Sequence, residues 1–391
     1  MIRRIDERGD MRRLSKTRQC GFSLLEMMVA LALGAIILSA AVGLYTRAVS
    51  ATWSVSQRTE LQQDFRAASN MLTKDLSMAG SGLGTSVQIA LPSGAGTQRP
   101  VYGCDQTPIC YINGGSVAYP LQGAVPYLYG LIPGWRFGPT VNAAAGATDI
   151  VTVVNSDTNF LLNCYNATVN AAGTAVTFLE VTFPTRPANC VIPPPLLQPQ
   201  AINDPAVGLT PGDLIQFQVT VGGVSSSIIG EVTNVTLVSN APRTYTVAFA
   251  TGDPLKMNQP AAAAGSLGNV RNATGFANRI FVNTYYIDNT IDPPRLMRQV
   301  SGHSPVPVAE GVAFLQFSYD LYDFNTAHVL VNQPDGGASQ GLTPSQITKA
   351  NILHMSMRST MHGVKGYQGL DLQTSVSTRD LTFNNSYPLA P

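Results

Sequence analysis

The sequence predicts an α+β protein in which a long N-terminal helix packs on a β-rich, loop-rich head, and the first half of that helix spans a membrane. Three observations predict this fold class. Residues 22–46 contain a single charged side chain. An apolar stripe then continues at helical spacing to residue 79. From residue 85 onward, runs rich in β-branched and aromatic residues alternate with Gly, Pro and Asn clusters.

The apolar run is long enough to cross a bilayer. Its 25 residues form a helix of about 37 Å at about 1.5 Å per residue, against a bilayer core of about 30 Å. Seven Lys and Arg and three Asp and Glu side chains precede the run, whereas the flank at 47–57 has only Arg47. The positive-inside rule therefore predicts a cytoplasmic N-terminus and a periplasmic head.

Charge limits the partners of the head. Seven of the 24 Lys and Arg side chains, but only three of the 23 Asp and Glu side chains, precede residue 22. The remainder is slightly acidic, so its overall charge does not favour nucleic-acid binding.

Glu26 conflicts with a simple membrane segment. A carboxylate at depth costs roughly 2.5–3.5 kcal/mol on insertion scales and is by default functional. A cleaved secretory signal has a shorter apolar region followed by its cleavage site, whereas the small residues SAA at 39–41 lie inside this run. A plain signal anchor leaves Glu26 unexplained.

The stretch GFSLLEMMVALALG, residues 21–34, resembles the class III signal of type IV prepilins and pseudopilins: a basic leader ending in Gly, then Phe, three uncharged residues, Glu and an apolar helix. The resemblance implies a leader at 1–21, cleavage by prepilin peptidase between Gly21 and Phe22, and N-methylation of Phe22. It also implies that Glu26 neutralises the N-terminal amine of a neighbouring subunit during filament assembly. Met11 is an alternative start that gives a shorter leader without acidic residues.

The helix is expected to extend beyond the membrane. Its transmembrane part covers 22–46, the whole helix covers 22–79, and Gly80 ends it as a C-cap. The second half has apolar residues spaced by three and four positions, namely Leu61, Phe65, Ala68, Leu72, Leu76 and Ala79.

The head, residues 80–391, is expected to be β-rich, with a linker or internal boundary near 191–205. The predicted strands cover 147–155, 174–183, 213–221, 226–239, 243–250, 279–288, 295–300, 312–323 and 350–360. The last segments, YYIDNTIDPPRLMRQV, VAEGVAFLQFSYD and ANILHMSMRST, resemble minor pilins of the PilW class and, more distantly, GspJ-type minor pseudopilins. Residues 85–275 align with neither.

Cysteine usage suits an oxidising compartment. Cys20 leaves with the leader, and four cysteines remain in the head. Three pairings are open; we favour Cys104 with Cys110 and Cys164 with Cys190, because each pair closes a short segment. A zinc site is the rival interpretation, but the spacing lacks a CxxC.

The sequence does not predict an enzyme, a cofactor or a metal site. The four histidines are scattered, and HExxH and GxSxG are absent. We expect carboxylates such as Asp149, Asp157, Glu180 and Asp213 to be solvated residues of turns and strand ends. The segment NSDTN at 155–159 lacks a full set of calcium ligands, and GSGLG at 80–84 follows a helix instead of a strand.

These observations predict a minor type IV pilin that is stored as a single-pass inner-membrane protein. We expect prepilin peptidase to process it, and we expect it to join other minor pilins and the major pilin at the cell surface. There it would prime or cap the filament near the tip, in the company of a tip adhesin. Two alternatives stay open. The chain is a minor pseudopilin of a type II secretion system, or a pilus-borne adhesin or DNA-uptake subunit whose binding module is 85–275.

Overall fold

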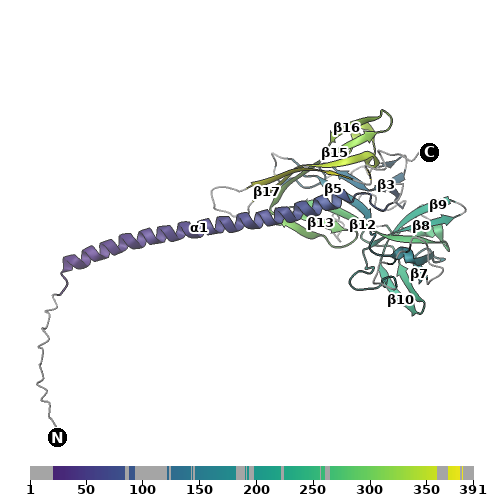
Figure 1. Cartoon of the computed structure of the whole chain (residues 1–391), viewed down its shortest axis with the longest axis horizontal. Coiled ribbons are helices and arrows are strands. Elements are labelled where there is room, and N and C mark those ends of the chain that lie inside the picture. The colour runs from purple at the N-terminus through teal and green to yellow at the C-terminus, as the bar shows by residue number, and fades with distance from the viewer. Residues whose placement is uncertain are drawn as a thin grey trace, which may run out of the picture. The chain divides into compact units, whose positions relative to one another are not determined.

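The computed structural model describes residues 21–83, 88–92, 121–122, 125–141, 143, 146–181, 190, 192, 198–221, 224–255, 257–259, 265–358, 369–378 and 381. It confirms the predicted α+β class: one long helix is followed by a head of antiparallel sheets (Figure 1). The chain divides into two compact units, residues 1–57 and 58–391, and helix α1 (Leu24–Ser77) contributes to both.

In the first unit, α1 is solvent-exposed on nearly all sides. Leu24, Leu31, Ile37 and Leu44 are each more than 60% exposed in the isolated chain. Among the described residues, α1 is the helix that is long and apolar enough to cross a membrane. A surface this apolar is unfavourable in water, which is consistent with membrane anchoring of this part of the helix.

In the second unit, the apolar stripe of α1 is the side that faces the core. Leu61, Ala68, Leu72 and Leu76 are buried in a cluster with residues of four strands, which are β5 (Ile150–Ser156), β12 (Thr274–Asp288), β15 (Val312–Asp323) and β17 (Ile347–Arg358). The α-helical turns end at Ser77, and the chain then continues in turns, with left-handed backbone at Gly80 and Gly82. We predicted helix up to residue 79, so the final turn is looser than the pattern indicated.

The described residues form eighteen strands in three antiparallel sheets. The largest sheet has eleven strands, with a main order of β10-β11-β7-β6-β12-β13-β14; β4 and β5, and β8 and β9, join it through β12. Its strands are β4 (Leu131–Gly134), β5 (Ile150–Ser156), β6 (Tyr165–Val169), β7 (Ala175–Glu180), β8 (Leu214–Val221), β9 (Val224–Glu231), β10 (Asn234–Asn240), β11 (Arg243–Ala248), β12 (Thr274–Asp288), β13 (Arg295–Val300) and β14 (Val306–Glu310).

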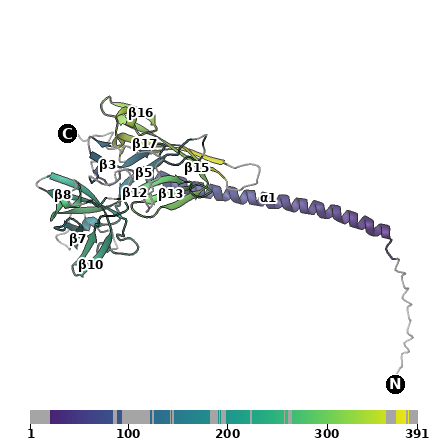
Figure 2. The same ribbon diagram turned by 180° about the vertical axis from the view of Figure 1, so that it is seen from behind.

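Two smaller sheets complete the head. The four-stranded sheet has the order β16-β15-β17-β18, and the three-stranded sheet has the order β1-β3-β2. In both views β15, β16 and β17 lie together, and β7, β8 and β10 form a second group (Figures 1 and 2). The strands are β15 (Val312–Asp323), β16 (His328–Gln333), β17 (Ile347–Arg358), β18 (Gly369–Ser377), β1 (Gln88–Ala90), β2 (Leu121–Gln122) and β3 (Val125–Tyr129); 3₁₀ turns cover Leu162–Cys164, Leu267–Val270, Ala338–Gln340 and Pro344–Gln346.

Strand β12 is the centre of the large sheet. From its first residue to its last, its 15 residues pair with β6, β8, β5 and β13 in that order. Strands on both sides of the proline-rich segment 191–205 therefore belong to one sheet. The predicted single strand at 226–239 is wrong: β9 ends at Glu231 and β10 begins at Asn234, because the chain turns at 232–233 to pair with β11 instead of β8.

A pair of buried carboxyl groups lies where β9 ends. Glu231 is 1% exposed and Asp253 is 4% exposed. The backbone N–H of Leu255 donates to Glu231, and those of Met257 and Asn258 donate to Asp253. Burial, together with the hydrogen bond and the charge of Asp253, raises the pKa of Glu231 far above its usual range. Glu231 therefore stays protonated at neutral pH, and its carboxyl O–H donates a hydrogen bond to Asp253.

This pair makes a testable contribution to pH dependence. The unfolded chain releases the Glu231 proton above about pH 4.5 and the folded chain keeps it, so the free energy of unfolding falls as pH rises through neutrality. Glu231→Gln mimics the protonated group and should remove that fall. Urea denaturation of the full chain in micelles at pH 5 and pH 8 measures the difference.

Glu310→Gln is the matched control, because Glu310 lies on β14 with its side chain 53% exposed. Its pH profile should follow the parent protein. Equal losses of stability in the parent and in Glu231→Gln between the two pH values would show that Glu231 does not retain its proton.

Candidate functional site

The predicted processing segment lies at the N-terminus of α1. Gly21, Phe22 and Ser23 precede the helix, which begins at Leu24. The Ser23 hydroxyl accepts the backbone N–H of Glu26 at 3.2 Å, and the Glu26 carboxylate accepts the backbone N–H of Ser23 at 3.4 Å. This reciprocal pair is a capping box, which satisfies two helix N–H groups that otherwise have no partner.

The capping box gives Glu26 a role that our sequence reasoning missed. The signal was present as Ser, two leucines and Glu at residues 23–26, a pattern that marks a helix start. The carboxylate also lies at the positive end of the helix dipole, where a negative charge is stabilised. Glu26 is therefore held at the helix terminus, close in sequence to the bond between Gly21 and Phe22.

A second site fixes the other end of α1 to the head. Asp75, in the last turns of the helix, is 7% exposed. The Tyr285 hydroxyl donates to its Oδ2 atom at 2.7 Å, and the Arg298 Nε group donates to the same atom at 2.9 Å. Tyr285 on β12 and Arg298 on β13 are cross-strand partners. Burial, chiefly, raises the pKa of Tyr285, which stays a neutral donor.

Three carboxylates expected to be solvated are buried with partners. Asp157 and Asp213 both contact Arg279 of β12, and His303 Nε2 lies 2.9 Å from Asp213. Asp149 accepts backbone N–H groups of Arg136 and Phe317, and burial raises its pKa to about 6. The expectation of solvated turn residues is wrong here, because their partners come from strands distant in sequence.

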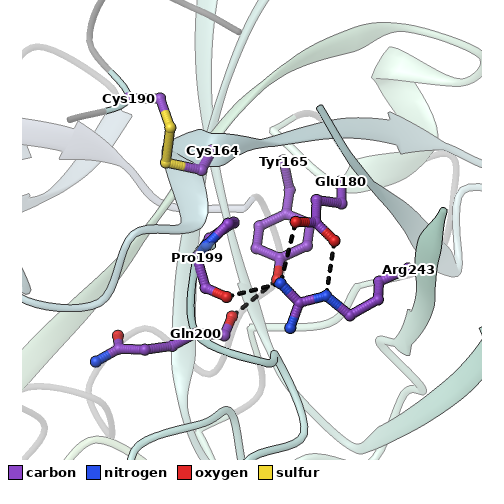
Figure 3. Close-up of a disulfide and its surroundings, with 7 residues drawn as sticks. All are labelled: Cys164, Tyr165, Glu180, Cys190, Pro199, Gln200 and Arg243. Carbon is purple, nitrogen blue, oxygen red and sulfur yellow. Dashed lines mark hydrogen bonds and ion pairs between the residues drawn. A yellow bond between two sulfur atoms is a disulfide. The ribbon is translucent and has the colours of Figure 1, made fainter. Parts of the chain in front are cut away.

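Glu180, the fourth carboxylate, pairs with Arg243 beside a disulfide (Figure 3). Cys164 and Cys190 are bonded, with Cα atoms 4.9 Å apart. Arg243 also donates to the carbonyl of Pro199 at 2.8 Å, and the Tyr165 hydroxyl donates to the carbonyl of Gln200 at 2.8 Å. Pro199 and Gln200 are thus bonded to β11 and β6, and Cys190 is bonded to the 3₁₀ turn that precedes β6.

None of these clusters has the arrangement of a catalytic or metal centre. Each carboxylate is matched by an arginine, a histidine or backbone N–H groups, which is the pattern of structural polar networks. The part of the chain that the structure describes contains no group of three or more metal-ligating side chains. Residues 1–20 of the predicted leader, together with Cys104 and Cys110, lie outside the described residues.

A comparison with models of protein families matched the Prokaryotic N-terminal methylation motif over residues 16–42. No curated protein and no solved structure matched the chain. The motif supports a type IV pilin-like protein, a class that includes pilins and pseudopilins. It implies processing by prepilin peptidase and assembly with other pilins, and it suggests a structural pilin substrate. The apolar helix is consistent with membrane anchoring before assembly.

The Asp75 contacts predict a large stability change. Asp75→Ala should lower the free energy of unfolding by about 2–4 kcal/mol, because it leaves the half-buried Arg298 charge and the buried Tyr285 hydroxyl without their acceptor. Asp64→Ala, in the same half of α1, should change it by less than about 1 kcal/mol. Urea denaturation followed by circular dichroism measures both. Equal effects of the two substitutions would contradict a stabilising role for the Asp75 contacts.

Proposed function

We propose that this chain is a minor type IV pilin of the PilW type, cleaved between Gly21 and Phe22 and N-methylated at Phe22. Before assembly it is stored in the inner membrane with its head in the periplasm. It then joins other minor pilins and the major pilin to prime the filament near its tip. The observation that carries the proposal is the methylation motif over residues 16–42, placed directly at the start of a long apolar helix.

The surroundings of Gly21 support recognition by an enzyme. A Cβ atom at Gly21 would meet no atom within 4 Å, and no positive φ is recorded there. Neither packing nor backbone geometry of this chain therefore requires glycine. Phe22 is 82% exposed, so the adjoining bond is open to a peptidase. The requirement for glycine then lies in the peptidase active site.

The proposed role of Glu26 follows from where the helix begins. Cleavage would create an α-amine at Phe22, immediately before the capping residue Ser23. In the membrane, that ammonium group and the Glu26 carboxylate are each costly without a partner of opposite charge. Pairing each with its counterpart on a neighbouring subunit removes both costs and fixes the axial register of the subunits.

The mass of the intact, unreduced protein from membranes and from sheared filaments tests processing. We expect a chain that begins at Phe22 and carries one additional methyl group. A chain that begins at Met1 or Met11, or after Ala41, would overturn the proposal. A strain that lacks the gene distinguishes a type IV pilus subunit from a type II secretion subunit. Loss of pili would support the minor pilin, whereas loss of protein secretion would support the minor pseudopilin.

Two substitutions separate the charge of Glu26 from its capping role. Glu26→Gln removes the charge but keeps an acceptor that suits a capping box. Ser23→Ala removes the cap but keeps the charge. We expect Glu26→Gln to be cleaved and methylated yet depleted from filaments at least tenfold, and Ser23→Ala to be incorporated. Immunoblots of sheared filaments and membranes measure both.

The reverse pattern would show that Glu26 acts as a helix cap. Normal incorporation of both variants would exclude the proposed pairing between subunits. Because these readouts concern assembly alone, they do not depend on any ligand of the head.

A further inference from the structure

The outer face of the large sheet carries a row of threonines. One threonine from each of five neighbouring strands, β10, β11, β7, β6 and β12, lies opposite the next in the strand register. With strands about 4.8 Å apart, the row is about 19 Å long. We call this surface the threonine face, and its central row is Thr236, Thr246, Thr177, Thr168 and Thr274.

The row lies at the protein surface. Thr236 and Thr274, at its two ends, are exposed, and the three threonines between them are half-buried. The hydroxyls of Thr168 and Thr274 lie 2.9 Å apart and are hydrogen-bonded in an exposed setting. The residues that alternate with these threonines along the strands, such as Phe178 and Tyr245, point to the opposite side of the sheet and are buried in the hydrophobic core. The face is therefore a hydroxyl array on a rigid support.

The threonine face has no charge at its described positions. Across β6, β7, β10, β11 and the first residues of β12, the charged side chains are Glu180 and Arg243. Both belong to the opposite side, where they pair with each other at 2.6 Å and Arg243 binds Pro199 (Figure 3). A polyanion such as DNA, which is held by Lys and Arg contacts to phosphates, has no counter-charge here.

Apolar side chains lie beside the hydroxyl row. Leu179 on β7 and Phe276 on β12 are each 40% exposed. Both are two residues away from a threonine of the row on the same strand, so they project from the same face. Gln218 of β8 pairs with Phe276 in the register and is exposed. The surface thus combines hydroxyls, an amide and an aromatic ring.

We propose that the threonine face binds a neutral polysaccharide. An apolar protein surface placed on it would bury the hydroxyls without new partners, which costs free energy for each group. Sugar hydroxyls both donate and accept hydrogen bonds, as threonine does. The apolar faces of sugar rings suit an exposed phenyl ring, and an uncharged polymer matches an uncharged surface. The inference does not depend on the processing or assembly of the helix.

The test uses the full mature chain in lipid nanodiscs, because detergents with sugar headgroups would compete. The probe is an array of dextran, cello-oligosaccharides and chito-oligosaccharides, with heparin as the charged comparison. We expect the parent protein to bind at least one neutral glycan and not heparin. Thr168→Val with Thr177→Val, which removes two hydroxyls with little change of shape, should weaken that binding at least tenfold, and Phe276→Ala should do so too.

Thr374→Val on β18 is the matched control, since it changes a half-buried threonine of the four-stranded sheet; it should bind as the parent does. Circular dichroism melting verifies that each variant is folded. No binding to any neutral glycan, preference for heparin, or equal binding by the parent and the double variant would each overturn the proposal. Self-association that the double variant abolishes would likewise overturn it, in favour of a contact between copies.

Discussion

The contact of Asp75 with Tyr285 and Arg298 determines how the helix meets the head. A carboxylate near the C-terminal end of a helix is opposed by the helix dipole, so it needs a strong partner, and the two cross-strand neighbours supply one. The same strand, β12, pairs with most of the large sheet. A single buried charge therefore sets the register of α1 against the strand from which the rest of the head extends.

The two ends of α1 use carboxylates in opposite ways. Glu26 lies at the favourable end of the dipole, is exposed in the isolated chain, and closes a capping box. Asp75 lies at the unfavourable end and is buried against an arginine. In the function that we propose, the first exchanges its partner when subunits meet, whereas the second keeps its partner within the chain. That proposal assigns assembly and folding to different ends of one helix.

Much of this organisation could be predicted because its signals are local. Periodicity from Leu61 to Leu76 identified the packed side of the helix, and the spacing of Gly21, Phe22 and Glu26 identified the signal. The buried ion pairs could not be predicted in this way. Asp157 and Arg279 are separated by 122 residues, and a single sequence has no local feature that joins them. The threonine row likewise depends on strand register, which periodicity leaves undetermined.

The threonine face also has a consequence for the entropy of recognition. β-branching restricts χ1, so a threonine in a strand has few rotamers to lose. Long flexible side chains at an interface each cost about 0.5–1.5 kcal/mol to immobilise on binding. A surface of threonines backed by the aromatic core of Phe178 and Tyr245 avoids most of that cost. Each contact of such a surface is weak, but the side chains are already ordered before a ligand binds. The affinity would therefore come from the number of contacts along the row.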